Sequence, residues 1–246
     1  MNRLVCLLAL VAGVSALASA QPGSFSVNQN GKPVGTAGFD VTPSAGGGFA
    51  STSTVRVKMQ GLEYALSKTE ELSAARGLVH VQLSAIVNGS AVNVVAKSDG
   101  AQLLMNISAN GRSSTTPLTA HGNAVFLPDF DPGALDTLLA VAAKNNNRDL
   151  WAIIPKQAGS VEAVRLATYR DEQGTLDGIP ITVHHLVATI AGADMDLFSG
   201  QENELLQAEL PQDGFALVRN GFVLKPPTKP PVPPTALNPA QAPATQ

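Results

Sequence analysis

The chain has 246 residues, 16 Lys and Arg against 19 Asp and Glu, and a formal net charge of −3. This balance, without a dense basic run, argues against nucleic acid or an anionic membrane surface as a partner. Aromatic residues make up only 4% of the chain, which also disfavours base-stacking platforms and sugar-binding surfaces built on exposed rings.

Residues 1–20 have the pattern of a secretory signal peptide. Arg3 supplies the basic start, Leu4 to Ala18 is mostly apolar, and Ala18-Ser19-Ala20 is a small-x-small cleavage site. We therefore expect an exported protein, periplasmic or extracellular in a bacterium. The apolar run is too short for a stable membrane span, and we expect no transmembrane span in the mature chain. Cleavage would remove Cys6, the only cysteine, and with it any disulfide or thiol site.

Residues 21–224 are predicted to form a single antiparallel β domain. Outside its most regular part, the predicted strands are 34–41, 49–59, 62–73, 124–127, 150–155, 161–169, 181–190, 195–198, 204–210 and 215–222.

Three turn dipeptides, Asn88-Gly89, Asp99-Gly100 and Asn110-Gly111, are spaced eleven residues apart and predict a four-strand meander. Two-residue turns at these sites give a register that can be written out. The expected pairs are Ala85 with Val92, Leu83 with Val94 and Val81 with Ala96 in the first hairpin, and Ala96 with Leu103, Val94 with Met105 and Val92 with Ile107 in the second. All these residues share one apolar face, as in a sheet covered on one side only.

One segment, residues 132–144, is predicted to be helical. Asp131 can cap it, Pro132 suits the first helical position, and Leu135, Leu138, Leu139 and Ala142 form an apolar stripe. We expect this helix to cover or plug the apolar face of the sheet. The predicted fold class is mainly β: an antiparallel meander forming a curved half-barrel or sandwich with one covering α-helix.

The chain resembles the bacterial lipoprotein-carrier type of half-barrel and related envelope proteins of unknown function. The features that carry this resemblance are the export signal, the meander, the helix after "LPDFDPGALD" and the closing run "GIPITVHHLVATIAGADMDLF". The resemblance is one of pattern over most of residues 24–224, and no site residue can be transferred from it. It implies a curved sheet that encloses an apolar cavity able to hold acyl chains. The single helix and the few aromatic residues depart from the carriers.

The tail, residues 225–246, contains eight prolines and no apolar periodicity. It is predicted to be a disordered, polyproline-like segment. It would be either a spacer or partner ligand, or an inert solvated terminus.

Sequence patterns for metal binding are weak. His184 and His185 are adjacent, so a strand would point them to opposite faces and keep them from chelating one ion. Asp129, Asp131 and Asp136 lack the full ligand series of a calcium loop, and helix capping accounts better for Asp131. We therefore predict no metal site.

Patterns for catalysis and for cofactors are equally weak. There is no G-x-S-x-G elbow for a hydrolase, and Gly46–Gly48 are not followed by the Lys and Ser or Thr of a phosphate loop. We predict no catalytic residues and no cofactor, and an uncharacterised hydrolase is only the third hypothesis for the function.

The leading hypothesis is a non-enzymatic protein that binds an acyl chain or hydrophobic segment on the apolar face of its sheet. The candidate ligand-binding residues are Val81, Leu83, Val92, Val94, Leu103, Met105, Ile107, Leu135, Leu138 and Leu139. The same residues would equally describe a closed core. The alternative is a cell-envelope scaffold that binds an envelope protein through strand edges and the proline-rich tail.

Overall fold

The computed structural model describes residues 23–156 and 159–226, so the predicted signal peptide and residues 227–246 of the predicted tail lie outside the described residues. The described part is mainly β with one helix, as expected. In chain order the elements are β1 (Gly23–Gln29), β2 (Lys32–Pro43), β3 (Phe49–Met59), β4 (Leu62–Leu72), β5 (Leu78–Val87), β6 (Ser90–Asp99), β7 (Gln102–Ala109), β8 (Arg112–Thr119), β9 (Ala124–Phe126), α1 (Pro132–Lys144), β10 (Leu150–Ile154), β11 (Ser160–Thr168), β12 (Glu172–Leu176), β13 (Ile179–Ile190), β14 (Ala193–Ser199), β15 (Leu205–Leu210), β16 (Phe215–Arg219) and β17 (Phe222–Leu224).

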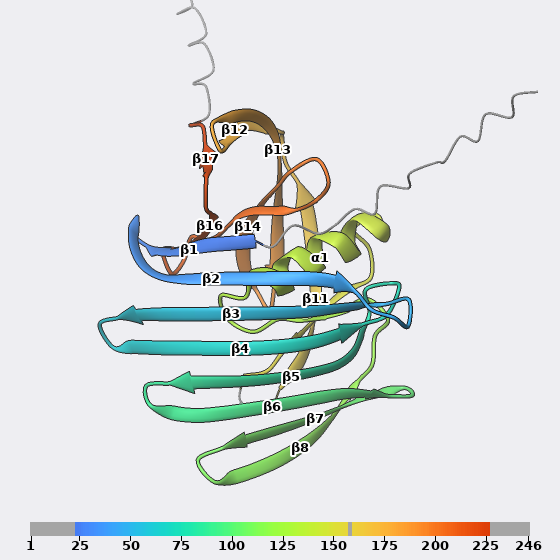
Figure 1. Ribbon diagram of the computed structural model, residues 1–246. Coiled ribbons are helices and arrows are strands. Elements are labelled where there is room, and N and C mark those ends of the chain that lie inside the picture. Colours follow the sequence, from blue (N-terminus) through green and yellow to red (C-terminus); the bar gives the residue numbers. More distant parts are fainter. Residues whose placement is uncertain (1–22, 157–158, 227–246) are drawn as a thin grey trace, which may run out of the picture.

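The described strands form one continuous sheet. Strands β2 to β8 are an antiparallel meander, and Figure 1 shows them stacked as a curved layer with the later strands behind, running steeply to them. Strand β1 joins the two parts because it pairs with β2 on one side and with β16 on the other. At the far end β9 pairs in parallel with β10. Among the described strands, β8 is in register with β7 alone, so the sheet is curved but open.

Three strands were not predicted. Strand β1 is short and rich in Gly and Ser, β12 has the sequence "EQGTL" with little apolar alternation, and the segment predicted as 215–222 is divided into β16 and β17 by a turn at Asn220-Gly221. Local turns do mark two of them, because β1 pairs with β2 around Asn30-Gly31 and β12 pairs with β13 around Asp177-Gly178. In addition, β1 pairs with the distant strand β16, and β12 with β17.

The first predicted hairpin is confirmed in detail. Asn88 and Gly89 both have positive φ, at 50° and 81°, as a mirror-image turn requires. Ala85 pairs with Val92, Leu83 with Val94 and Val81 with Ala96.

The predicted register of the second hairpin was wrong by two residues. Of the candidate turn residues only Gly100 has positive φ, at 60°, so the turn is Gly100-Ala101 rather than Asp99-Gly100. The observed pairs are Ser98 with Leu103, Ala96 with Met105, Val94 with Ile107 and Val92 with Ala109. Since the shift is an even number of residues, the apolar face is unchanged.

Helix α1 has the predicted bounds and lies inside the curve of the sheet. The Asp131 carboxylate caps it, because Oδ1 accepts hydrogen bonds from the Gly133 and Ala134 backbone N–H groups at 2.9 and 3.2 Å. The helix contacts β1, β2, β3, β9 and β15, and its residues are buried on almost every side. The helix therefore fills the interior of the fold, and more of its surface is buried than the predicted apolar stripe alone. At 13 residues, α1 does not reach the length of a membrane-spanning helix.

Candidate functional site

The ten candidate ligand-binding residues do lie together, but they form part of the packed core and not an open binding surface. Eight of them are at most 3% exposed: Val81, Leu83, Val94, Leu103, Met105, Leu135, Leu138 and Leu139. Val92 and Ile107 are half-buried and pack against the same cluster. Of the ten, only Leu135 lines the apolar pocket described next.

This pocket has a volume of about 390 Å³ and lies where several turns meet at one end of the sheet. We call it the end pocket. Its apolar wall consists of Leu62, Leu127, Pro128, Phe130, Leu135, Ile154, Ile190, Ala193, Met195, Leu210, Phe215 and Leu217. It is at the small end of the range for ligand sites in proteins, which is about 300–1,000 Å³.

The charged groups of the end pocket are mostly acidic. Asp129, Asp131, Asp194 and Asp213 line it, with Lys156 as the single basic residue. Lys156 Nζ lies 2.8 Å from Asp129 Oδ1, and both side chains are about half exposed. This lining disfavours an anionic group on a bound molecule.

Phe130, in the wall of the end pocket, has a strained backbone. Its φ of 57° is in the left-handed region, which a bulky side chain adopts at a cost of about 1–3 kcal/mol. Its ring packs edge-on against Phe215 and Tyr64, with centroid separations of 4.9 and 6.1 Å. The Tyr64 hydroxyl donates to the Asp129 carbonyl at 3.4 Å, and burial, with Asp129 and Asp131 adding to it, raises the pKa of Tyr64. These contacts hold the 127–131 loop in place.

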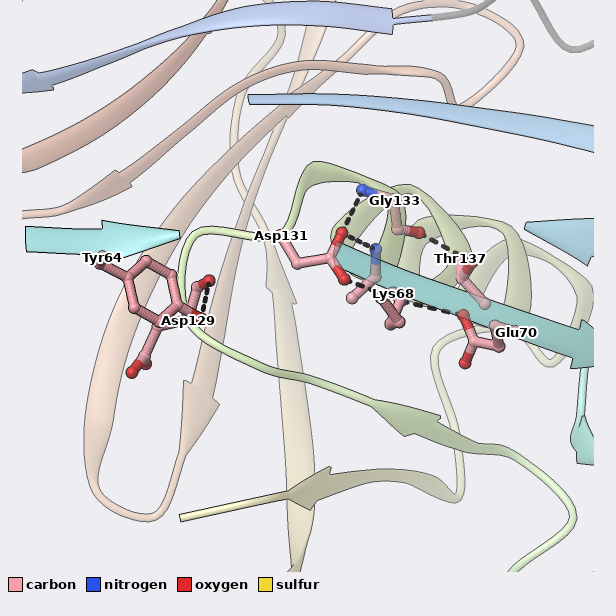
Figure 2. A network of polar contacts seen from close by, with 8 residues as sticks. Tyr64, Lys68, Glu70, Asp129, Asp131, Gly133 and Thr137 are labelled. Carbon is pink, nitrogen blue, oxygen red and sulfur yellow. Dashed lines mark hydrogen bonds and ion pairs between the residues drawn. The ribbon is translucent and has the colours of Figure 1, made fainter. Parts of the chain in front are cut away.

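Behind the end pocket lies a second polar group, which we call the buried triad: Lys68, Glu70 and Asp131 (Figure 2). Lys68 Nζ lies 2.7 Å from Asp131 Oδ2 and 3.0 Å from Glu70 Oε2, and all three side chains are 0% exposed. Lys68 and Glu70 point inward from β4 beside the start of α1, where Leu83 and Val81 of β5 are their register partners. The triad therefore ties the internal helix to the meander.

The triad holds two carboxylates against one ammonium in an apolar setting. Burial raises the pKa of Glu70, and Lys68 only partly opposes this. Burial alone lowers the pKa of Lys68, but Asp131 and Glu70 together outweigh it and raise that pKa. The neighbouring Ser51 and Ser53 hydroxyls and Glu70 Oε1 are buried without a hydrogen-bond partner among the described residues. Protonation of Glu70 would leave the site neutral.

Sequence reasoning found Asp131 as a cap but missed Lys68 and Glu70. Strand alternation alone could have found them: in the predicted strand 62–73 they share the inward face with Leu66 and Leu72. A Lys and a Glu two residues apart on an apolar face are the signal of a buried ion pair.

The other singled-out polar residues have separate partners. His184 Nδ1 lies 2.9 Å from Asp171 Oδ1, while His185 Nε2 lies 2.8 Å from Asp196 Oδ1 and its ring stacks between Tyr169 and Phe198. Asp129, Asp131 and Asp136 contact Lys156, Lys68 and the Leu205 backbone N–H respectively.

Asp136 provides a test of pH dependence. Burial raises its pKa above the usual 3.8, although the Leu205 N–H, 3.2 Å from Oδ1, opposes this. The folded protein thus holds this proton more tightly than the unfolded chain, and stability is lost as the pH rises through the folded pKa. Asp136→Asn has no proton to lose, so it avoids that loss of stability, and its side-chain oxygen can still accept the hydrogen bond from the Leu205 N–H. This variant should melt at a higher temperature than the unmodified protein at about pH 7. The two melting temperatures should become equal below the usual carboxyl pKa.

The measurement is thermal unfolding followed at both pH values. The exposed residue Asp99 supplies the control, because Asp99→Asn should leave the melting temperature almost unchanged. A lower melting temperature for Asp136→Asn near neutral pH would contradict the argument.

A curved, open antiparallel sheet with an internal helix and a small apolar pocket at one end defines a β-barrel-like protein. Among solved structures, the fold is similar to the crystal structure of a β-barrel-like protein of domain of unknown function DUF1849 from Brucella abortus, with a TM-score of 0.53 and 11% sequence identity, over 83% of this chain and 97% of that one. No protein-family model and no curated protein matches the chain. At this identity the similarity shows the fold alone.

Proposed function

We propose that this is an exported, non-enzymatic protein that binds a hydrophobic ligand in the end pocket, with a function like that of the lipoprotein carriers. The single observation that carries the proposal is an apolar pocket of about 390 Å³ beside a packed core, rather than an open apolar face. Its volume suits one acyl chain or a few apolar side chains. The pattern of a signal peptide supports export.

The strained loop supports binding at this place. A bulky residue held at positive φ is an outlier, and such strained residues cluster at active sites and ligand clamps. Phe130 is such a residue, and the wall that it forms is fixed on either side by Tyr64 and Phe215. The end pocket therefore has one wall preorganised for an apolar group.

The acidic lining narrows the ligand class. A free fatty acid would bring its carboxylate toward Asp129, Asp194 and Asp213, with only Lys156 to offset the repulsion. An esterified acyl chain, a neutral apolar group or an apolar group beside a positive charge avoids this repulsion. We propose that the ligand belongs to one of these three classes.

Filling the pocket tests the proposal. Ala193 is exposed at the start of β14 and lines the end pocket, so Ala193→Trp places an indole in its mouth. The neutral fluorophore N-phenyl-1-naphthylamine should bind the unmodified protein saturably, and Ala193→Trp should weaken its binding at least about tenfold, which corresponds to about 1.4 kcal/mol. Ala167→Trp, on an exposed alanine of β11 that does not line this pocket, is the matched control.

Competition then tests the ligand class. Dodecylamine should displace the fluorophore at lower concentration than dodecanoate does. Equal displacement by the two would remove the role of the acidic lining. Equal fluorophore binding by Ala193→Trp and Ala167→Trp would remove the end pocket as the site.

A further inference from the structure

We infer that the chain forms an internal covalent cross-link, an amide between Lys68 Nζ and Asp131 Cγ, with Glu70 as the acid-base group. This inference does not depend on the proposed function. It rests on the geometry and burial of the triad.

The reacting groups are already in contact and shielded from water. Lys68 Nζ lies 2.7 Å from Asp131 Oδ2, and neither side chain has any exposed surface. Reactants held in contact at a fixed orientation behave as if present at a very high concentration, on the order of 10⁵ M or more. The amide also replaces two buried charges with one neutral group, which removes the desolvation penalty of the pair.

The start of α1 supplies the electrostatic stabilisation that amide formation requires. When Nζ attacks Cγ, negative charge develops on Oδ1. This oxygen already accepts the Gly133 and Ala134 backbone N–H groups at 2.9 and 3.2 Å, so the two donors form a preorganised oxyanion hole. Oδ2, on the Lys68 side, is the oxygen that leaves.

Glu70 is placed to move the protons. Its Oε2 lies 3.0 Å from Nζ, and its Oε1 is buried without a hydrogen-bond partner among the described residues. Burial raises the pKa of Glu70, which favours the protonated form that can donate a proton.

The reaction balances without an oxidant or a second reactant. The Lys68 ammonium first passes one proton to the Asp131 carboxylate, which leaves a neutral amine and a carboxylic acid. The C–N bond forms, the C–Oδ2 bond breaks, Glu70 takes a proton from the nitrogen and gives its own to Oδ2, and water departs. The net change is ammonium plus carboxylate to amide plus water, and Glu70 returns to its starting state.

Tryptic digestion of the full chain purified from its producing cells, followed by tandem mass spectrometry, tests the cross-link. The expected product is a branched peptide that joins residues 59–76, uncleaved at Lys68, to residues 113–144, lighter by one water than the two peptides together. Linear peptides 59–68, 69–76 and unmodified 113–144 would overturn the inference. Because the readout is at the peptide level, processing of the N-terminus does not affect it.

Two variants assign the roles. Lys68→Arg keeps the positive charge but offers no amine nucleophile, so the branched peptide should fall from the main form to undetectable. Glu70→Gln cannot exchange protons, so cross-linking should slow on the order of a hundredfold and freshly made protein should be mostly linear. Any branched peptide that joins a fragment of residues 59–76 to residues 113–144 in Lys68→Arg would overturn the assignment to Lys68. Unchanged cross-linking in Glu70→Gln would overturn the role of Glu70. The exposed pair Lys58 and Glu63, 3.6 Å apart, is the internal control and should remain unlinked.

Discussion

Replacing Lys68 with methionine is expected to lower the free energy of unfolding by about 3–5 kcal/mol, because it leaves Glu70 and Asp131 buried without their counter-ion. Methionine keeps most of the side-chain volume, so the loss is electrostatic rather than one of packing. Denaturant unfolding monitored by circular dichroism measures the difference. An amide at this site would enlarge it, since the cross-link also restricts the unfolded chain between residues 68 and 131.

The matched control is Lys58→Met on the neighbouring strand β3. Lys58 pairs with Glu63, but the two side chains are 81% and 64% exposed. Exposed pairs contribute little, so the expected change is within about 0.5 kcal/mol. Similar losses for Lys68→Met and Lys58→Met would mean that the triad does not hold the interior together.

Leu138→Ala is expected to cost about 2–5 kcal/mol, because Leu138 is 0% exposed in the middle of the internal helix and its truncation leaves a cavity between α1 and the sheet. The same denaturant unfolding measures it. Leu104→Ala removes the same atoms from a side chain that is 38% exposed on the outer face of β7, and should cost less than about 1 kcal/mol. A small effect at Leu138 would show that the helix is a loosely held cover rather than a plug.

Local chemistry explains what the sequence could predict. Positive φ at Asn88-Gly89 and Asn110-Gly111 fixed two hairpins of the meander, and Asp131 with Pro132 fixed the start of α1. The alternation of side chains then placed Val81, Leu83, Val94 and Met105 on one face without knowledge of the curvature. The register of the second hairpin was misjudged because Gly100 suits either of two turns. It can be the second residue of a turn with positive φ at both positions, or the first residue of a turn with positive φ there alone, and the second case is the one observed.

The parts that sequence reasoning missed depend on distant pairing. The curve of the sheet brings residues 127–135, 190–195 and 210–217 around one pocket, and no local pattern encodes that meeting. Likewise, Lys68 and Asp131 are 63 positions apart, and only the insertion of α1 under β4 makes them neighbours. Their inward placement was readable from alternation, but their contact was not.

The place of β1 between β2 and β16 has a consequence for the order of assembly. Each hairpin from β1 to β8 can form as soon as its own residues are available, because its two strands are adjacent in sequence. The pairing of β1 with β16 is different, because Phe25 and its register partner Arg219 are separated by most of the chain. Strand β1 can pair early with β2, but its other edge must await β16, so a chain cut short before β16 would keep its meander and leave that edge of β1 unpaired.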